Sequence, residues 1–177
     1  MGKYLDKSPR TGPEYFTTYK QRGEWVELLF MTRAAKRGFG VSKPWGDSSR
    51  YDVILEQNGR FIRVQVKCTD RWTGSAYSCI LYAAHQHAYT TKQLDYFAIY
   101  LVPDDIWYIF PAKKLIGQSA VILTPHRHGH KHGRYKEAWD LLESRKPTKG
   151  AAHFPKPLSK TKFRPRRKIA PTASLSS

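Results

Sequence analysis

The dipeptide Asn58-Gly59 stands between two runs in which apolar and polar residues alternate. Asparagine followed by glycine is the strongest local signal for a two-residue β-hairpin turn of type I′. With that loop, the positions pair in a fixed order and Asp52 lies opposite Gln65. By the same count, Arg50 lies opposite Lys67. A shift of one residue would turn every side chain to the other face, so this register decides which residues are buried.

The two faces of this hairpin differ in chemistry because side chains of a strand alternate between faces. One face gathers the apolar residues Val53, Leu55, Ile62, Val64, Val66 and Cys68. The other face presents Asp52, Gln65 and Lys67. We expect the first face in the core. Taken alone, the second face fits a solvated side of a hairpin as well as a reactive site.

A helix is predicted ahead of the hairpin. The run 21–37 has helical composition, and a glycine follows it at the position that commonly ends a helix. Glu24 and Glu27 are three residues apart and therefore lie on one side of this helix. Carboxylates there and the polar face of the hairpin predict a divalent-cation site, with oxygen donors from Glu27, Asp52 and Gln65.

A resemblance to a known family is found in the run RGEWVELLFMTRAAKRGFGVSKPWGDSSRYDVILEQNGRFIRVQVKCT. This run resembles the core of the PD-(D/E)XK nuclease superfamily, and is most similar to the branch of group I intron homing endonucleases. The similarity is close over 21–69 and looser through LDYFAIYLVPDDIWYIFPAKKL. It implies a restriction-endonuclease-like fold of the α/β (α+β) class, with helices flanking a mixed central β-sheet. It also implies Mg²⁺ as cofactor, for which Mn²⁺ is expected to substitute.

The resemblance assigns roles to four residues: Glu27 as the helix glutamate, Asp52 as the motif aspartate, Gln65 at the second acidic position and Lys67 as the lysine. Glu24 is a weaker candidate for the first role. Most of the superfamily has Asp or Glu where this chain has Gln65, although the intron-endonuclease branch accepts glutamine. A carboxamide oxygen can bind magnesium but brings no charge, which implies weaker metal binding, fewer metal ions or lost activity.

The resemblance also implies separate roles for the cation and for Lys67 in hydrolysis. A cation held by Asp52, Glu27 and the backbone carbonyl of Val66 would acidify the attacking water and offset the phosphate charge. Lys67 would orient or help activate that water and contact the phosphate. Further nucleic-acid contacts are expected from Arg50, Arg63, Trp45, Arg71 and Trp72, and from Arg164, Arg166, Arg167 and Lys168. The alternatives are solvated charges for the arginines and core-covering rings for the tryptophans.

Charge points to a nucleic-acid partner. The chain has 31 Lys and Arg against 14 Asp and Glu, a net charge of +17 that suits a polyanion such as DNA. Ten of these basic residues lie in 144–177, which has no acidic residue. Prolines and the absence of apolar periodicity predict that this tail is disordered alone, or is an arm along DNA or a neighbouring subunit. A merely solvated extension is the alternative.

The remaining sequence predicts one domain over 13–143, after an N-terminal segment at 1–12 and before the tail. Its expected elements are a strand at 76–82, a hairpin of 97–102 with 106–110, a short helix at 111–115, an edge strand at 119–123 and a helix at 135–143. Four alternating histidines, His126, His128, His130 and His132, are expected to bond phosphates or face water. No acidic or cysteine ligand lies near them, which disfavours a transition-metal site.

The resemblance implies a magnesium-dependent DNA endonuclease of the homing type, and the net charge suits its DNA substrate. A dimer or higher homo-oligomer is expected because one site cuts one strand. The alternatives are a structure-selective nuclease like a Holliday junction resolvase, and a catalytically inactive DNA-binding module of the same fold. Two cysteines and no signal peptide predict reduced thiols in a cytoplasmic protein, and no stretch approaches the length needed to span a membrane.

Overall fold

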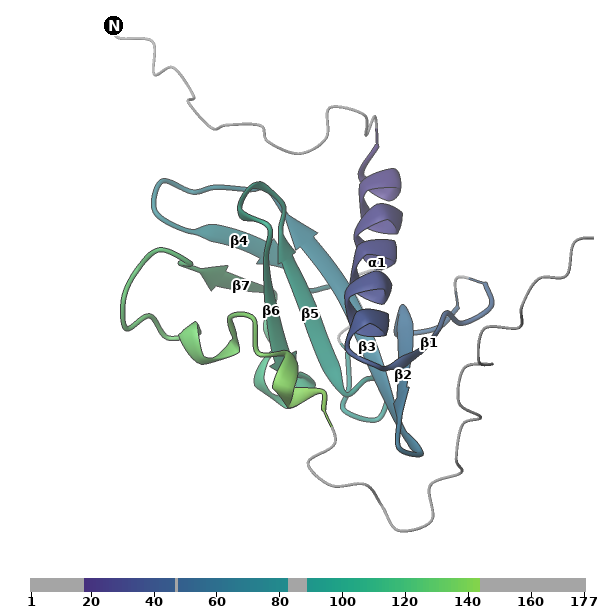
Figure 1. The fold of residues 1–177 in the computed structure, drawn as a ribbon. Coiled ribbons are helices and arrows are strands. Elements are labelled where there is room, and N and C mark those ends of the chain that lie inside the picture. The colour runs from purple at the N-terminus through teal and green to yellow at the C-terminus, as the bar shows by residue number, and fades with distance from the viewer. Residues whose placement is uncertain (1–17, 47, 83–88, 144–177) are drawn as a thin grey trace, which may run out of the picture.

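The computed structural model describes residues 18–46, 48–82 and 89–143. Its helix and strands, in chain order, are α1 (Tyr19–Lys36), β1 (Gly40–Ser42), β2 (Val53–Gln57), β3 (Arg60–Thr69), β4 (Tyr77–Ile80), β5 (Tyr96–Leu101), β6 (Ile106–Pro111) and β7 (Ala120–Leu123) (Figure 1). Four 3₁₀ turns complete it: η2 (Val102–Asp104), η3 (Ala112–Lys114), η4 (Gly133–Tyr135) and η5 (Trp139–Leu141). The predicted segments 1–12 and 144–177 lie outside the described residues.

Five of the strands form a mixed sheet in the order β1-β2-β3-β5-β6. β3 pairs antiparallel with β2 and parallel with β5, and β6 returns antiparallel beside β5. The mixed central sheet predicted from the sequence is therefore confirmed. Within the described ranges, no helix has both the length and the apolar character to cross a membrane.

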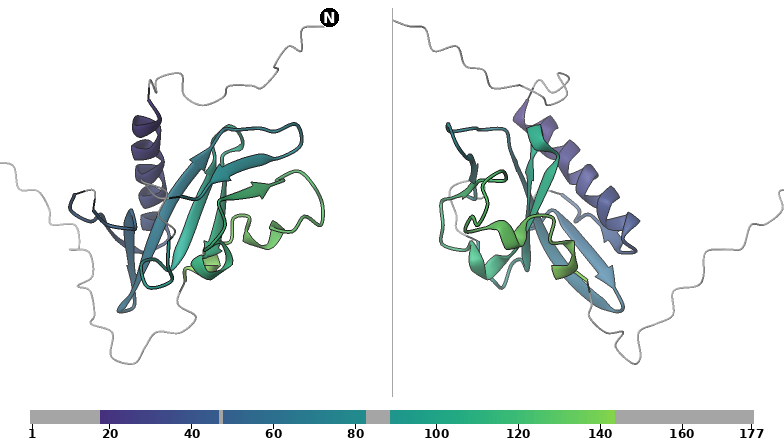
Figure 2. Two further views of the ribbon diagram at one scale, coloured as in Figure 1. Left: turned by 180° about the vertical axis from the view of Figure 1, so that it is seen from behind. Right: turned by 60° about the vertical axis from the view of Figure 1, so that its left-hand side comes forward.

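Each face of this sheet is covered by a different layer. α1 packs on one face through Val26, Phe30 and Ala34, which are buried together with the apolar face of the hairpin. The antiparallel pair β4 and β7 covers the opposite face, as the turned view in Figure 2 shows. The helix begins at a cap in which Thr18 Oγ1 accepts a hydrogen bond from the Gln21 N–H at 3.2 Å.

The predicted hairpin forms, and the predicted register is confirmed over β2, from Val53 to Gln57. The expected strand pairs of Asp52 with Gln65 and of Arg50 with Lys67 are wrong, because β2 begins at Val53 and the Asp52 N–H bonds the carbonyl of Val64. Asn58 and Gly59 have φ angles of 55° and 76°, and positive values at both loop positions are what a type I′ turn requires. β2 and β3 then pair from Gln57 with Arg60 to Val53 with Val64. The side chains predicted to be apolar partners lie in the core under α1.

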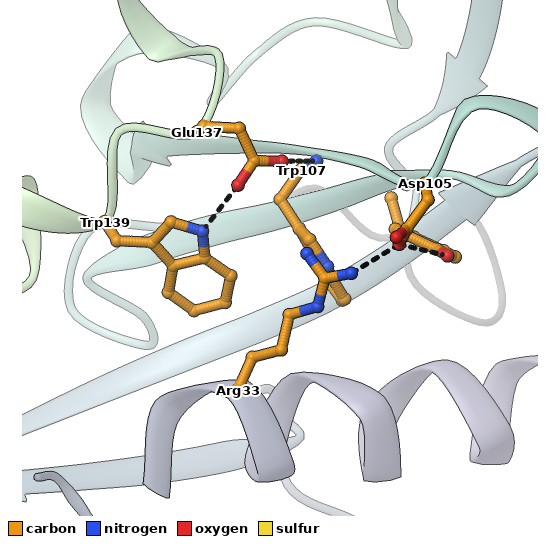
Figure 3. A network of polar contacts seen from close by, with 6 residues as sticks. Arg33, Asp105, Trp107, Glu137 and Trp139 are labelled. Atoms are coloured by element: carbon orange, nitrogen blue, oxygen red, sulfur yellow. Dashed lines mark hydrogen bonds and ion pairs between the residues drawn. The ribbon is translucent and has the colours of Figure 1, made fainter. Parts of the chain in front are cut away.

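The helix predicted over 135–143 is wrong. The turns η4 and η5 lie there instead, separated by Glu137 with φ 49°, which an α-helix does not accommodate. The carboxylate of Glu137 accepts hydrogen bonds from the Trp107 N–H at 2.6 Å and from Trp139 Nε1 at 2.9 Å (Figure 3). Bonds to β6, distant in sequence, outweigh the local helical propensity.

Three further features of the structure differ from the sequence prediction. The strands expected over 76–82 and 119–123 form, but they pair with each other in a separate sheet. β1 was not predicted. The short helix expected over 111–115 is the 3₁₀ turn η3, which follows Pro111.

Candidate metal centre and nucleic-acid site

Asp52 lies directly before β2, where the chain departs from the regular ladder. Its N–H donates to the carbonyl of Val64 at 2.9 Å, although Val64 is already the partner of Val53. Two residues facing one on the neighbouring strand make a β-bulge, which redirects the side chain of the extra residue. The Asp52 carboxylate turns towards β3, and its Oδ2 accepts a hydrogen bond from the Val66 N–H at 2.8 Å.

The backbone of Val66 faces this carboxylate because β2 ends before reaching it. The N–H and C=O of one strand residue point to the same side, so both project past the end of β2. Asp52 takes the N–H, and the carbonyl oxygen of Val66 stays beside the carboxylate. This is the backbone oxygen expected to bind a cation.

Gln65 is buried, with 7% of its surface exposed, yet its side chain lines the site. Its Nε2 lies 2.5 Å from Asp52 Oδ2 and 3.4 Å from the Val66 carbonyl oxygen. Both partners are acceptors, so the amide nitrogen has to face them and the amide oxygen points elsewhere. Gln65 can supply an oxygen to a cation here only after its amide turns over.

The helix brings a second carboxylate into electrostatic reach. Burial raises the pKa of Asp52, the negative charge of Glu27 raises it further, and the result is a pKa of about 6. The Val66 N–H, the charge of Lys67 and the Gln65 amide act in the opposite direction. Burial and a neighbouring negative charge disfavour the ionised form of Asp52, and a bound cation would favour it.

A lysine that the sequence did not single out lies at this site. Lys43 Nζ is 2.6 Å from Glu27 Oε2. The hydrogen bond to Glu27 raises the pKa of Lys43 against the effect of burial, and the charges of Glu27, Asp52 and Glu24 raise it further. Lys43 follows β1, a strand too short to be predicted, and no motif spacing marks it.

Lys67 lies on the same strand face as Gln65. Its Nζ is 3.4 Å from the backbone oxygen of Tyr82 and 5.7 Å from the centre of the Tyr89 ring. The hydrogen bond is long and therefore weak. Lys67 is the positive charge that acts on Asp52, so the structure brings together Glu27, Asp52, Gln65 and Lys67.

The residues expected to contact nucleic acid differ in whether their side chains already form hydrogen bonds or ion pairs within the protein. Arg63 is held by Asp95: its Nε lies 3.1 Å from Oδ2, its Nη2 lies 3.0 Å from Oδ1, and its backbone N–H also donates to Oδ2. An arginine engaged in this way already has a structural role. Arg50 is half-buried and makes no hydrogen bond or ion pair to the described part of the chain.

The exposed candidates lie on two loops, between β1 and β2 and between β3 and β4. Trp45 is fully exposed, Arg71 is exposed, and Trp72 is 40% exposed with its ring 4.8 Å from that of Tyr77. Packing on Tyr77 fits the covering role for Trp72, whereas Trp45 covers nothing. The four basic candidates of the tail, Arg164, Arg166, Arg167 and Lys168, lie outside the described residues.

The donor set fits a hard cation. No group of three His, Cys, Asp or Glu is close enough to hold a metal ion within 18–46, 48–82 and 89–143, and this includes the four histidines. The candidate centre has two carboxylates, so a cation held there would take further oxygens from the Val66 carbonyl and, once its amide has turned, from Gln65. Oδ1 of Asp52 accepts no hydrogen bond from the described residues, which leaves it available. Carboxylate, carbonyl and amide oxygens are the ligands that Mg²⁺ prefers.

Comparisons with known proteins identify the family and similar structures. The model of the PD-(D/E)XK endonuclease family matches residues 17–142. Among solved structures, the bacterial homing endonuclease I-Ssp6803I is similar, with a TM-score of 0.63 and 25% sequence identity over 72% of this chain and 92% of that chain. No curated protein matches the chain. The matched range contains the four residues of the candidate centre.

Proposed function

Because the chain belongs to the PD-(D/E)XK endonuclease family, we propose that it cuts DNA by magnesium-dependent hydrolysis of phosphodiester bonds. Membership confirms the resemblance drawn from the sequence, and the chain is a nuclease with a restriction-endonuclease-like fold. Homing-type cleavage is favoured by the likeness to a bacterial homing endonuclease. The observation that carries the proposal is the Asp52 carboxylate, held against the Val66 N–H and close to the charge of Glu27.

Asp52, Glu27 and the Val66 carbonyl would hold the metal ion, joined by Gln65 once its amide has turned. When bound, a divalent cation lowers the pKa of a coordinated water and offsets the charge that builds on the phosphate. Asp52 is already oriented by the Val66 N–H, so it needs no reorganisation to bind. We expect Mn²⁺ to substitute for Mg²⁺.

Lys67 would act on the phosphate and on the attacking water. Its present acceptor is a neutral carbonyl 3.4 Å away, and an anionic phosphate oxygen would be a stronger partner. The positive charge also favours the ionised form of Asp52, which is the form that binds a cation. Lys67 would thus both contact the phosphate and favour the ionised form of Asp52.

The proposal extends to partners and surroundings. A homo-oligomer, a dimer or higher, would cut both DNA strands together, because each chain has one site and one site cuts one strand. Arg50, Trp45, Arg71 and Trp72 would contact DNA beside the site, and Arg63 would do so only while bound to Asp95. The basic tail would bind the DNA backbone, which is proposed from its charge alone. A cytoplasmic location is proposed from cysteine content.

One observation favours a second candidate, a DNA-binding module that has lost turnover. Gln65 is neutral and presents its nitrogen to Asp52 and Val66, and this arrangement opposes metal binding until the amide turns. Such a module would bind DNA through the same candidate contacts. Only an assay with metal distinguishes it from an active nuclease.

The decisive experiment is nicking of supercoiled DNA of mixed sequence with and without Mg²⁺ or Mn²⁺. We expect cleavage only with metal, and a loss of about 100-fold or more in Asp52→Ala and Lys67→Ala, with DNA binding largely intact. Lys114→Ala, which removes an exposed charge in η3, is the matched control and should cut normally. Equal cleavage by all four proteins would reject the site.

Further substrates separate the candidates. Preference for a four-way junction over linear duplex and single strand would indicate a junction resolvase. Binding without cleavage of any substrate, with either metal, would indicate the inactive module.

A further inference from the structure

The segment 124–136, which we call the basic loop, connects β7 to Glu137 and takes no part in the candidate metal centre. Four of its residues are Lys or Arg, four are His, and none is Asp or Glu: the basic residues are Arg127, Lys131, Arg134 and Lys136. Such a concentration of one sign of charge suits an anionic ligand.

The basic loop is held against the sheet by its own side chains. The His130 ring lies 6.2 Å from the Tyr108 ring, and the His132 ring lies 5.4 Å from the Phe110 ring, both edge-on. Lys136 Nζ donates to the Pro125 carbonyl at 3.1 Å and joins the two ends of the loop. These two histidines therefore help to hold the basic loop against β6.

Both ends of the basic loop are also tied to β5 and β6. His126 Nε2 lies 3.1 Å from Asp104 Oδ2, in the turn between those strands. At the other end, Glu137 bonds the Trp107 N–H and Trp139 Nε1, as Figure 3 shows. A loop fixed in this way loses little conformational entropy when it binds a ligand.

The basic loop lines an open hollow of about 510 Å³ whose lining is cationic. Arg127, Arg134, Lys136 and three histidines line it, and no carboxylate does. The Nδ1 of His130 is buried and has no hydrogen-bond partner among the described residues. The guanidinium groups of Arg127 and Arg134 make no hydrogen bond or ion pair within that part of the chain, so they are available to a ligand.

The basic loop lies on the same face of the central sheet as Lys67. Lys67 pairs with Ile99, and Ile99 pairs with Tyr108, against which His130 packs. Residues paired across strands share a face, and neighbouring strands lie about 4.8 Å apart. Tyr108 is thus two strands, or roughly 10 Å, from the strand of Lys67. Duplex DNA carries one charge per about 1.7 Å of its axis, so its backbone offers several phosphates over a distance of this size.

We propose that the basic loop binds the phosphodiester backbone of the DNA substrate, with Arg127 and Arg134 as its principal contacts. The inference rests on the proposed function, because it takes the ligand to be the DNA that the nuclease cuts. Backbone contacts fix the position of a duplex and do not read its sequence. The loop would position DNA relative to Lys67 and is not a catalytic element.

The test measures binding of the full-length chain to a 30-base-pair duplex of mixed sequence in EDTA, by fluorescence anisotropy at several salt concentrations. The double variant Arg127→Gln/Arg134→Gln should lower the log–log salt slope by about 1.8, since each neutralised phosphate contributes about 0.9. Arg127→Gln alone should lower it by about half as much. The matched control Lys113→Gln/Lys114→Gln removes two exposed charges from η3 and should leave the slope unchanged.

A slope equal to that of the unaltered protein in the double variant would overturn the proposal. So would an equal fall in the double variant and the control, because net charge alone would then explain binding. Thermal unfolding shows whether each variant is folded, and the single variant provides the comparison if the double variant is not. Binding is measured without metal, so failure of the nuclease assignment would appear separately, as absence of cleavage by the unaltered protein with Mg²⁺.

Discussion

The ammonium of Lys43 lies 2.6 Å from Oε2 of Glu27, so one of the two carboxylates at the candidate centre is already paired with a positive charge. Asp52 and Glu24 add to the field that favours this charge. An ion pair that is partly exposed is worth at most about 1 kcal/mol. A divalent cation can therefore displace Lys43 from Glu27, at some cost in affinity.

Replacing Lys43 by glutamine should tighten metal binding. The change removes a positive charge that competes for Glu27, and we expect the affinity for Mn²⁺ to rise about three- to tenfold. Titration calorimetry of the protein without DNA measures this directly. Lys36→Gln, at the end of α1, is the matched control. An affinity no higher than that of the unaltered protein would show that Lys43 does not compete.

Asp52→Asn should stabilise the metal-free protein at neutral pH. The pKa of Asp52 is about 6 when folded, against an ordinary 3.8, so the folded state favours the neutral form. The ionised carboxylate then reduces stability increasingly as pH rises from about 4 to 6, and the whole cost is present above pH 6. Asparagine keeps an oxygen for the Val66 N–H and carries no charge.

Chemical denaturation in EDTA at pH 7.5 and pH 5.0 measures this effect. We expect the free energy of unfolding of Asp52→Asn to exceed that of the unaltered protein by about 1–3 kcal/mol at pH 7.5, and by roughly half as much at pH 5.0. A difference that grows towards low pH would have the wrong sign and would contradict the raised pKa.

The parts of the fold set by neighbouring residues were predictable from the sequence. The Asn58-Gly59 turn specifies its own φ angles, and these angles specify the pairing of β2 with β3. Local sequence therefore places Asp52 and Gln65 at the same end of the hairpin. It does not predict the bulge at Asp52, because that depends on the free backbone of Val66 on the next strand.

Features that depend on distant residues were missed. Glu137 interrupts the helix expected over 135–143. Its carboxylate accepts hydrogen bonds from the Trp107 N–H in β6 and from Trp139 Nε1. The pairing of β4 with β7 joins segments far apart in sequence, so alternation alone could not distinguish it from an added edge strand. Lys43 was missed for the same reason, since only the packing of α1 brings Glu27 to it.

Glu137→Ala should destabilise the protein without touching the metal centre. The substitution leaves the Trp107 N–H and Trp139 Nε1 without their acceptor, and each missing bond of this kind costs about 1 kcal/mol. We expect the free energy of unfolding to fall by about 2 kcal/mol in chemical denaturation. Glu143→Ala, an exposed glutamate, is the control and should change little. Equal stability of both variants would show that the hydrogen bonds of Glu137 to Trp107 and Trp139 do not stabilise the protein.

Truncation before Arg145 should weaken DNA binding and its dependence on salt. Cutting the tail away removes ten positive charges and no negative charge. If the tail lies along DNA, the log–log salt slope should fall by about 0.9 for each phosphate that the tail had neutralised. Anisotropy titrations of the full-length and truncated chains with one duplex measure the slope. An unchanged slope would mean that the tail is a solvated extension.

Gln65→Glu should make the centre depend on metal for its stability. Gln65 Nε2 now donates to Asp52 Oδ2 at 2.5 Å, and a carboxylate there would set two negative charges in contact. Without metal we expect a lower melting temperature at pH 7.5. The two carboxylates, of Asp52 and of the new glutamate, either repel each other or must share a bound proton. With Mn²⁺ the added charge becomes a ligand, so the metal-induced rise in melting temperature should exceed that of the unaltered protein.

Gln65→Leu is the matched comparison, since it removes the amide without adding charge. It should lower stability by removing the hydrogen bond to Asp52, and it should show no enlarged response to Mn²⁺. Thermal unfolding of the three proteins in EDTA and in Mn²⁺ separates loss of a hydrogen bond from gain of a ligand. If Gln65→Glu and Gln65→Leu respond to Mn²⁺ alike, position 65 does not face the cation, and the neutral amide does not limit metal binding.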